Sequence, residues 1–159
     1  MIEQLTTQTP KDISEEFLQM FFEYANENHS YTLTDTHILL HKITKDLSID
    51  CALYLESGNL FGFIMYATIP SAFGDNHNML IHDIYVTKKR SGIGTKLMNY
   101  VIELSKDLSK RNIVIDEIVW MTGHDNIVAQ QLYRNFNPYE EKTINYSLKL
   151  GNSTGLRKN

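Results

Sequence analysis

The chain contains 159 residues, of which 42% are hydrophobic and 21% are charged, and its formal net charge at pH 7 is −4. These values exclude an intrinsically disordered chain and predict a globular protein with an ordinary hydrophobic core. The negative charge disfavours nucleic acid as a partner, because binding to a phosphate backbone requires a cationic face.

The cysteine content and the apolar runs bear on where the protein acts. Cys51 is the only cysteine, so a disulfide within the chain is excluded, and its apolar neighbours predict a buried side chain. The longest apolar run, residues 60–67, is too short to cross a bilayer, and the first residues lack the features of a signal peptide. We therefore expect a cytoplasmic protein with no membrane partner. The sequence leaves the oligomeric state open, with a homodimer among the alternatives.

The first part of the chain predicts a short strand and two helices. The strand is expected at residues 3–7, and a helix begins near Asp12, whose carboxylate suits the positive end of the helix dipole. The apolar face of this helix consists of Phe17, Met20, Phe21 and Tyr24. A second, less regular helix is expected from residue 34 to just before Ser48.

The middle of the chain predicts a hairpin and a third strand. Two β-like runs, 49–56 and 60–69, flank Ser57-Gly58-Asn59, which is typical of a tight turn between antiparallel strands. A loop is expected at residues 71–78, and a third apolar run at 79–86 is interpreted as a strand that leads directly into glycines.

The last part of the chain predicts a helix, a strand, a second helix and a final strand. The long helix starts after Gly92, and its apolar face consists of Leu97, Met98, Val101, Ile102, Leu104 and Leu108. The remaining elements are expected at 113–121, 125–135 and 143–150. Together these elements predict an α/β fold with a mixed sheet in one domain over residues 1–150, followed by a flexible tail at 151–159.

The most informative segment is the glycine turn, residues 87–95, where a strand ends and a helix begins. Gly92 and Gly94 allow the backbone to approach a ligand closely, and N–H groups at a helix start attract anions. Four cations lie in this segment or next to it: Lys88, Lys89, Arg90 and Lys96. The pattern predicts a phosphate-binding turn, although a purely structural turn can have the same sequence. Spacing disfavours a P-loop and also a dinucleotide-binding turn, which needs a third glycine where Leu97 stands.

Two motifs in this order resemble the GNAT superfamily of N-acetyltransferases. The cofactor turn of that family reads Arg/Gln-x-x-Gly-x-Gly/Ala, and the corresponding frame here is Lys89-Arg90-Ser91-Gly92-Ile93-Gly94. A second match lies downstream at Asn126-x-x-Ala129-x-x-x-Tyr133. The resemblance covers roughly residues 60–150 and implies a mixed, mostly antiparallel central sheet flanked by about four helices. The segments 83–86 and 120–122 are most similar to polyamine and histone acetyltransferases.

The chain departs from the family pattern at two places. Lys89 occupies the position of Arg or Gln in a turn that is shorter than usual, and the neighbouring Arg90 can supply the guanidinium instead. After Tyr133 the family usually has Gly-Phe, whereas this chain has Asn137-Pro138. We therefore expect Asn137 to adopt the left-handed conformation that glycine would otherwise provide.

The resemblance implies acetyl-CoA as the co-substrate and assigns residues to it. The backbone of Ile84, Tyr85 and Val86 would pair with the pantetheine arm. The pyrophosphate would be held by Lys89, Arg90, Ser91, Gly92, Ile93, Gly94 and Thr95. Asn126 would reach the cofactor arm. No metal is predicted, because the histidines show no metal-ligand spacing.

The resemblance also implies direct attack of an amine on the thioester in a ternary complex. Tyr133 would donate a proton to the leaving thiolate, although an aromatic residue in the core has the same helical spacing. His82 or Asp83 would accept the proton of the amine or bind the substrate, and strand alternation predicts that the two side chains face opposite sides of the sheet.

The acceptor implied by the resemblance is a primary amine. A polyamine, another small amine, a protein N-terminus and a lysine side chain all remain open. Two further functions are compatible with the sequence, namely a non-catalytic CoA-binding or sensory module and a phosphate-binding protein with no relation to CoA.

Overall fold

A computed structural model describes residues 1–28, 33–46, 48–72 and 74–141 of the chain. The strand expected at 143–150 and the tail expected at 151–159 therefore lie outside the described residues. Within these residues, five strands form one sheet in the order β1-β2-β3-β4-β5. The strands are β1 (Ile2–Gln4), β2 (Asp50–Glu56), β3 (Asn59–Pro70), β4 (His77–Val86) and β5 (Ile115–Trp120). Neighbouring strands are antiparallel except for β4 and β5, which are parallel.

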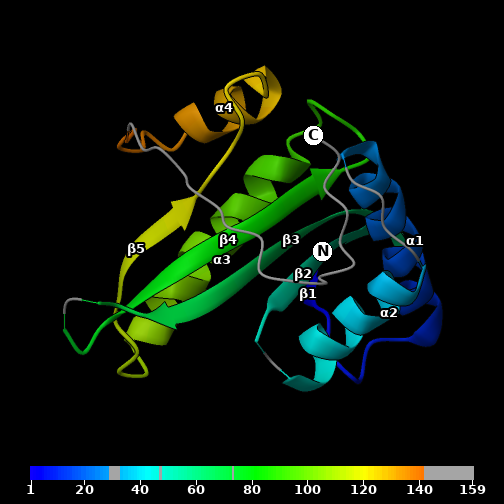
Figure 1. The fold of residues 1–159 in the computed structure, drawn as a ribbon, viewed down its shortest axis with the longest axis horizontal. Coiled ribbons are helices and arrows are strands. Elements are labelled where there is room, and N and C mark those ends of the chain that lie inside the picture. The colour runs from blue at the N-terminus through cyan, green and yellow to red at the C-terminus, as the bar shows by residue number, and fades with distance from the viewer. Residues whose placement is uncertain (29–32, 47, 73, 142–159) are drawn as a thin grey trace, which may run out of the picture.

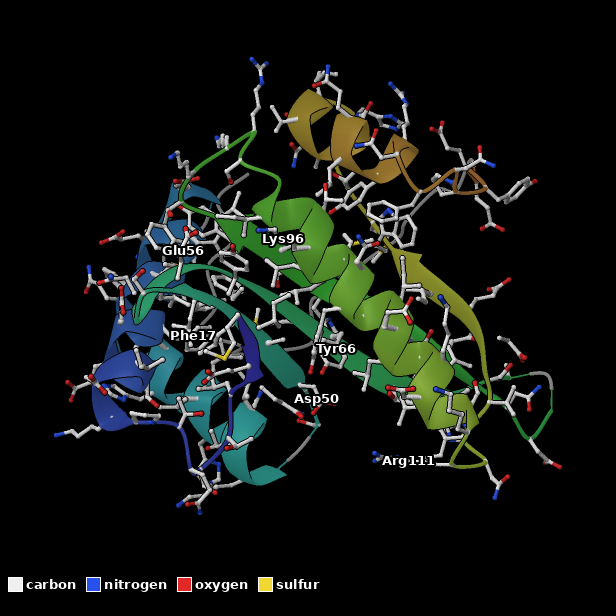
Figure 2. The ribbon with its side chains drawn as sticks, turned by 180° about the vertical axis from the view of Figure 1, so that it is seen from behind. Phe17, Asp50, Glu56, Tyr66, Lys96 and Arg111 are labelled. Atoms are coloured by element: carbon white, nitrogen blue, oxygen red, sulfur yellow. The ribbon has the colours of Figure 1, made fainter. Side chains whose placement is uncertain are left out.

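The helices cover both faces of this sheet, as Figure 1 shows. They are α1 (Lys11–Asn28), α2 (Leu33–His41), α3 (Ile93–Ser109) and α4 (Ile127–Arg134), and a π-helical segment, η1 (Lys42–Asp46), continues α2. α1 packs over one face, where Phe17 and Phe21 contact Phe63 of β3. α3 covers the other face, and Figure 2 shows it in front of the strands. The described part of the chain thus has the mixed, mostly antiparallel sheet and the four α-helices that the sequence predicts.

The core consists of two clusters separated by the sheet. One contains the apolar face of α1 together with Leu53, Phe63 and Met65. The other contains Ile64, Ile81 and the inner face of α3. Cys51 is fully buried, as predicted, and burial raises the pKa of its thiol well above the usual value. Alternate residues of β2 and β3 belong to the two clusters, because successive side chains of a strand point to opposite faces.

Several predicted elements are present with different ends. The hairpin turn is confirmed, and Ser57 and Gly58 have φ angles of 52° and 81°. Asn137, with φ of 50°, is left-handed as expected. β4 begins at His77, inside the segment predicted as a loop, because the N–H of His77 donates to the carbonyl of Val114 at 2.9 Å. A partner strand from far along the chain thus extends β4 into residues whose own pattern predicts no strand.

The regular alternation expected in β4 is interrupted by a β-bulge. Asp83 pairs with Met65 and Ile81 pairs with the next residue, Tyr66, so His82 is the extra residue of a β-bulge. The bulge shifts the alternation: Ile81 and Ile84 both contribute to the cluster under α3, whereas Tyr85 packs on the α1 side. A bulge of this kind redirects the side chains that follow it.

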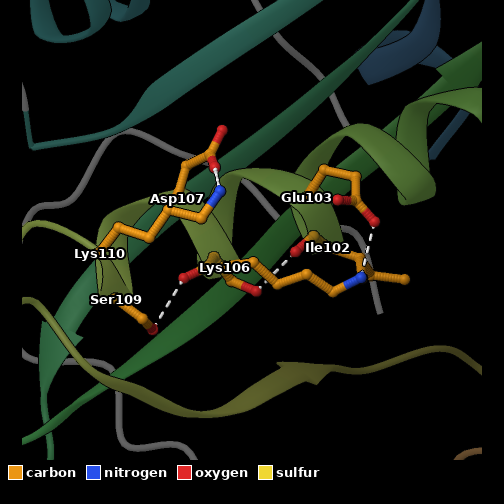
Figure 3. Close-up of polar contacts among 7 residues, drawn as sticks. Ile102, Glu103, Lys106, Asp107, Ser109 and Lys110 are labelled. Carbon is orange, nitrogen blue, oxygen red and sulfur yellow. Dashed lines mark hydrogen bonds and ion pairs between the residues drawn. The ribbon is translucent and has the colours of Figure 1, made fainter.

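The solvent-exposed side of α3 carries ion pairs between residues three apart. Lys106 lies 2.7 Å from Glu103, and Lys110 lies 2.7 Å from Asp107, as Figure 3 shows. Exposed pairs of this type contribute little to stability. The charged C-terminal half of α3 is therefore interpreted as a solvated surface, separate from the glycine turn at the other end of the helix.

Candidate active site

The glycine turn is held in shape by its own hydrogen bonds. The N–H of Thr87 donates to the carbonyl of Phe61 at 3.0 Å, and the Ser91 hydroxyl donates to the carbonyl of Lys88 at 2.6 Å. α3 then begins at Ile93 with Gly92 as its N-cap, and Gly92 has no side chain with which to cap the helix. The first N–H groups of α3 are therefore available to an external acceptor, and a phosphate is the acceptor that such helix starts bind best.

The two glycines of the turn serve different purposes. Gly92 has φ of 78°, a left-handed conformation, and a Cβ built on it would meet no atom within 4 Å. Gly94 lies inside the helix, where a Cβ would come within 3.0 Å of Leu132 Cδ2 on α4. Gly92 is therefore required by the backbone conformation, and Gly94 by the close approach of α4.

The cations of the turn do not all face the same way. Lys88, Lys89 and Arg90 are exposed, and Arg90 has φ of 59°. Lys96 instead turns back to the sheet, where its Nζ donates to the Tyr54 hydroxyl at 2.9 Å, and this hydrogen bond raises the pKa of Lys96. Figure 2 shows Lys96 at the start of α3, on the side where Glu56 lies. Three of the four predicted cations thus remain for a phosphate ligand.

β4 continues beyond the end of β5, as Figure 1 shows. The last paired residues are Ile81 and Trp120, where β5 ends. From Asp83 to Val86, β3 is the only strand among the described residues that pairs with β4. We call residues 82–86 the diverging end of β4. Its edge toward β5 offers backbone groups that an extended ligand arm can bind as a further strand would.

Tyr133 lies beside this diverging end. The ring is 8% exposed and packs with its centroid 5.4 Å from that of Trp120. Burial, and secondarily the charge of Asp83, raise the pKa of the Tyr133 phenol. The hydroxyl is therefore kept protonated at neutral pH and can act as a proton donor. The ring belongs to the core cluster under α3, so Tyr133 combines the two roles that the sequence left as alternatives: a packed core aromatic and a candidate acid.

Asp83 lies on the α1 side of the sheet and is half-buried. Its carboxylate accepts a hydrogen bond from the Tyr24 hydroxyl of α1. The Tyr24 ring is itself fixed by aromatic neighbours, with centroids 5.8 Å from Phe63 and 5.2 Å from Tyr85. Asp83 therefore has a defined position between α1 and the residues around Tyr133.

The surroundings of Tyr85 are anionic. Burial raises the pKa of the Tyr85 phenol, and the charges of Glu27 and Glu23 raise it further. Both glutamates belong to the C-terminal part of α1, which faces the diverging end of β4. With Asp83, these residues form the α1–β4 junction, defined here as Glu23, Tyr24, Glu27, Asp83 and Tyr85. The junction attracts cations, in contrast to the glycine turn.

Two further predicted site residues, His82 and Asn126, lie at the β-bulge and at the start of α4. His82 is the exposed residue of the β-bulge, next to Asp83 in the chain. Asn126 is the N-cap of α4, and its side-chain oxygen accepts the N–H of Ala129 at 3.2 Å. The Asn126 oxygen is thus used within the protein, which leaves the amide nitrogen as the group that can donate to a cofactor.

Most of the predicted site residues lie at the carboxyl end of β4 or in the glycine turn after it, whereas Asn126 caps α4 and Tyr133 lies within α4. The diverging end supplies Ile84, Tyr85 and Val86, and the glycine turn follows it directly in the chain. Tyr133 and Asp83 lie close enough to interact electrostatically. Sequence reasoning did not assign Tyr24 to the site: it is 59 residues from Asp83 and has the spacing of a core aromatic. The β-bulge also left no signal in the residue pattern.

Comparisons with known proteins agree with this architecture. The family model of the acetyltransferase (GNAT) family matches residues 10–137. None of the curated proteins is matched by a sequence search. A solved aminoglycoside acetyltransferase, meta-AAC0020 from an uncultured soil metagenomic sample, is similar with a TM-score of 0.76 at 21% identity, over 94% of this chain and 95% of that one. A ribosomal-protein-alanine N-acetyltransferase from Brucella melitensis has a TM-score of 0.73 at 16% identity, over 94% and 99%.

A third solved structure adds a bound cofactor analogue. AAC(6')-Iy, in complex with a bisubstrate analogue that contains CoA, has a TM-score of 0.77 at 13% identity, over 94% of this chain and 98% of that one. At these identities the solved structures show a shared fold. The fold and the matched family model define an acyltransferase. The chain belongs to the acetyltransferase (GNAT) family, whose members are acyl-CoA-dependent N-acetyltransferases.

Two features are absent from the described residues. No three His, Cys, Asp or Glu side chains in this part of the chain come together as a metal ion would require. Among the described helices, none has both the length and the apolar character needed to cross a membrane.

Proposed function

We propose that this protein transfers an acetyl group from acetyl-CoA to a primary amine by direct attack in a ternary complex. The observation that carries the proposal is the position of Tyr133, a protonated phenol beside the diverging end of β4. A thioester laid along this strand, with its pyrophosphate on the glycine turn, would bring its sulfur toward that phenol.

The proposed cofactor site uses the backbone more than side chains. The backbone groups of Ile84, Tyr85 and Val86 on the edge of β4 toward β5 would bind the pantetheine arm. The backbone N–H groups from Arg90 to Thr95 would bind the pyrophosphate. Lys89 and Arg90 would add charge from the solvent side, and Asn126 would donate its amide N–H to the arm. This division explains why a family position can change to Lys89: the helix start supplies most of the phosphate contacts.

The proposed chemistry needs a proton transfer to the sulfur and the loss of protons from the amine. The neutral amine attacks the thioester carbon, and the new C–N bond forms as the C–S bond breaks. Tyr133 gives its proton to the departing sulfur, and the proton that the nitrogen loses as the amide forms restores the Tyr133 phenol through solvent. A lysine-type amine has a pKa of about 10.4 and is mostly protonated at neutral pH, so it must lose a proton before it attacks. His82 and Asp83, adjacent at the β-bulge, are the groups proposed to receive that proton or to hold the amine.

The anionic α1–β4 junction favours a cationic acceptor. Glu23 and Glu27 act on Tyr85, and Asp83 is hydrogen-bonded to Tyr24, so the three carboxylates lie on the α1 side of the diverging end of β4. This charge supports a small polyamine or a lysine-type amine. Two similar solved proteins are an aminoglycoside acetyltransferase and a ribosomal-protein-alanine N-acetyltransferase, so their acceptor classes belong in the same screen.

The test is an acetyl-transfer screen with spermidine, a lysine peptide, an amino acid, an N-terminal alanine peptide and sisomicin, measured as thiol release. We expect turnover with at least one amine. Tyr133→Phe should lower kcat about 100-fold, with acetyl-CoA binding unchanged within about twofold. Tyr139→Phe, which removes a phenol that is 88% exposed, is the matched control and should keep the full rate.

Two outcomes would contradict the proposal. Full activity of Tyr133→Phe would remove the proposed acid. Thermal stabilisation by CoA but not by ATP or NAD, with no transfer to any amine, would indicate a non-catalytic CoA-binding module instead.

A further inference from the structure

A hydrogen bond joins α1 to the residue that follows the β-bulge of β4. Tyr24 and Asp83 belong to elements that are remote in sequence, yet the Tyr24 hydroxyl donates to the Asp83 carboxylate. The carboxylate follows the bulge residue His82, at the point where β4 loses its pairing with β5. A side chain at such a point has less support from neighbouring strands than one in the middle of the sheet.

The ring of Tyr24 is well fixed. Its centroid lies 5.9 Å from that of Phe21, 5.8 Å from Phe63 and 5.2 Å from Tyr85. The Tyr24–Phe63 pair is edge-to-face, with an interplanar angle of 77°. Contacts on several sides of the ring leave the hydroxyl with little freedom, and it can therefore impose a position on the carboxylate that accepts its hydrogen bond.

Asp83 and Tyr133 lie on different faces of the sheet. Tyr133 belongs to the core cluster under α3, whereas Asp83 contacts α1. Tyr133 nevertheless packs in the same cluster as Ile84, which follows Asp83 in the diverging end of β4, and the charge of Asp83 raises the pKa of the phenol. In acyl transfer the amine adds to a face of the thioester carbon, and the bond from that carbon to sulfur then breaks. A group that holds the amine and a group that protonates the sulfur therefore lie at different positions around the thioester, and Asp83 and Tyr133 have that relation.

We propose that Tyr24 is a positioning residue: it holds the Asp83 carboxylate toward the acceptor amine, on the side of the thioester opposite Tyr133. This inference rests on the proposed acetyl transfer and extends it by naming the residue of α1 that organises the acceptor side. Tyr24 acts through Asp83 and does not itself exchange a proton in the reaction. Glu23 and Glu27 attract the amine at longer range, and Asp83 is the contact that fixes it.

The test is a double-mutant cycle with Tyr24→Phe and Asp83→Asn. The acceptor is whichever of spermidine, the lysine peptide, the N-terminal alanine peptide and sisomicin gives the highest rate with the unmodified protein. We expect Tyr24→Phe alone to raise the KM for that amine roughly tenfold and to leave the KM for acetyl-CoA unchanged. In the Asp83→Asn background the same change should raise the amine KM by less than about twofold, since the carboxylate it positions is gone.

Tyr100→Phe is the matched control. Tyr100 is a half-buried tyrosine on α3 that packs against the core cluster on the other face of the sheet. Its substitution removes a comparable phenol without touching Asp83, and the amine KM should stay the same.

The possible results separate this inference from the function on which it rests. Absence of transfer by the unmodified protein to every amine overturns the acetyl-transfer proposal. Transfer that proceeds with the same amine KM in Tyr24→Phe overturns the positioning role alone. An equal rise in KM in both backgrounds also overturns it, because the effect of Tyr24 would then not pass through Asp83.

Discussion

Two regions meet at the carboxyl end of β4, and they differ in charge and in how they are built. The glycine turn is cationic and exposed, and its residues follow one another in the chain. The α1–β4 junction is anionic, and it combines residues 23–27 with residues 83–85. The first offers backbone N–H groups to phosphate, and the second offers carboxylates to an amine. The comparison shows that one end of a strand can support a cationic region and an anionic region. Here the anionic residues follow the β-bulge, and the cationic residues lie in the turn after the strand.

The two regions also differ in how solvent acts on them. Lys88, Lys89 and Arg90 are exposed, so salt screens their attraction for a cofactor. Asp83 and Tyr85 are half-buried, and interactions among partly buried groups are screened less. We therefore expect acetyl-CoA binding to depend more strongly on ionic strength than amine binding does.

The largest expected effect comes from reversing the charge of the turn. Lys89→Glu with Arg90→Glu should raise the KM for acetyl-CoA roughly 10- to 100-fold at low salt and less at high salt, because both changes place anions beside the phosphates. The KM for the amine should not change. Lys106→Glu with Lys110→Glu, the same charge change on the exposed side of α3, is the control. An equal effect of both pairs would show that net charge alone matters.

The second prediction concerns the link between the turn and Tyr133. Gly94→Ala places a Cβ 3.0 Å from Leu132 Cδ2, so Leu132 must move, and Tyr133 follows it directly in α4. We expect kcat to fall about fivefold, a loss typical of a small misplacement of a reacting group. Steady-state kinetics would measure it. An unchanged kcat would mean that α4 adjusts without displacing the phenol.

Neutralising the outer anions of the junction should have a smaller effect. Glu23→Gln with Glu27→Gln removes two charges that raise the pKa of Tyr85, so that pKa should fall. The KM for a cationic amine should rise about threefold, because these charges act at a distance. The KM for acetyl-CoA should be constant, and Glu103→Gln with Lys106→Gln offers a control pair on the far surface. A rise in the KM for acetyl-CoA as well as in the KM for the amine would show that the two glutamates do not act on the amine alone.

The smallest effect is expected on the titration of Tyr133. Burial and the Asp83 charge raise the pKa of this phenol above its usual value of about 10. The acid form therefore persists at neutral pH and is lost only on the alkaline side. Asp83→Asn removes the secondary cause, so the pKa of Tyr133 should fall but stay above its usual value, because burial of the phenol remains. Ultraviolet titration against a Tyr133→Phe reference would measure this, and a rise would contradict the placement of the two groups.

Much of the fold was predictable because its signals are local. The hairpin turn at Ser57 and Gly58, the apolar face of α3 and the left-handed Asn137 each follow from a few neighbouring residues. The ends of β4 and β5 were less predictable: His77 joins the sheet because it pairs with Pro70 of β3 and donates its N–H to Val114. The β-bulge at His82 was wrongly read as regular alternation, since a bulge is set by the register with β3.

The candidate site divides in the same way. The glycine turn could be predicted as an anion site because glycines, cations and a helix start are adjacent in the chain. The residues of the junction could not be grouped, because Tyr24 looks like any core aromatic of an amphipathic helix. For Gly94 the structure adds a reason that the sequence did not show, because a Cβ at this position would come within 3.0 Å of Leu132 Cδ2 on α4.

The sequence by itself determined the family, the order of elements and the cationic turn, since each depends on short-range patterns of glycine, charge and apolar spacing. Only the tertiary structure decided that Lys96 turns toward Tyr54, that Tyr24 reaches Asp83, and that Tyr133 is both buried and close to that carboxylate. The physical reason is that hydrogen bonds and electrostatic interactions depend on distance in space, and sheet register and helix packing bring together residues whose separation in the chain carries no such information.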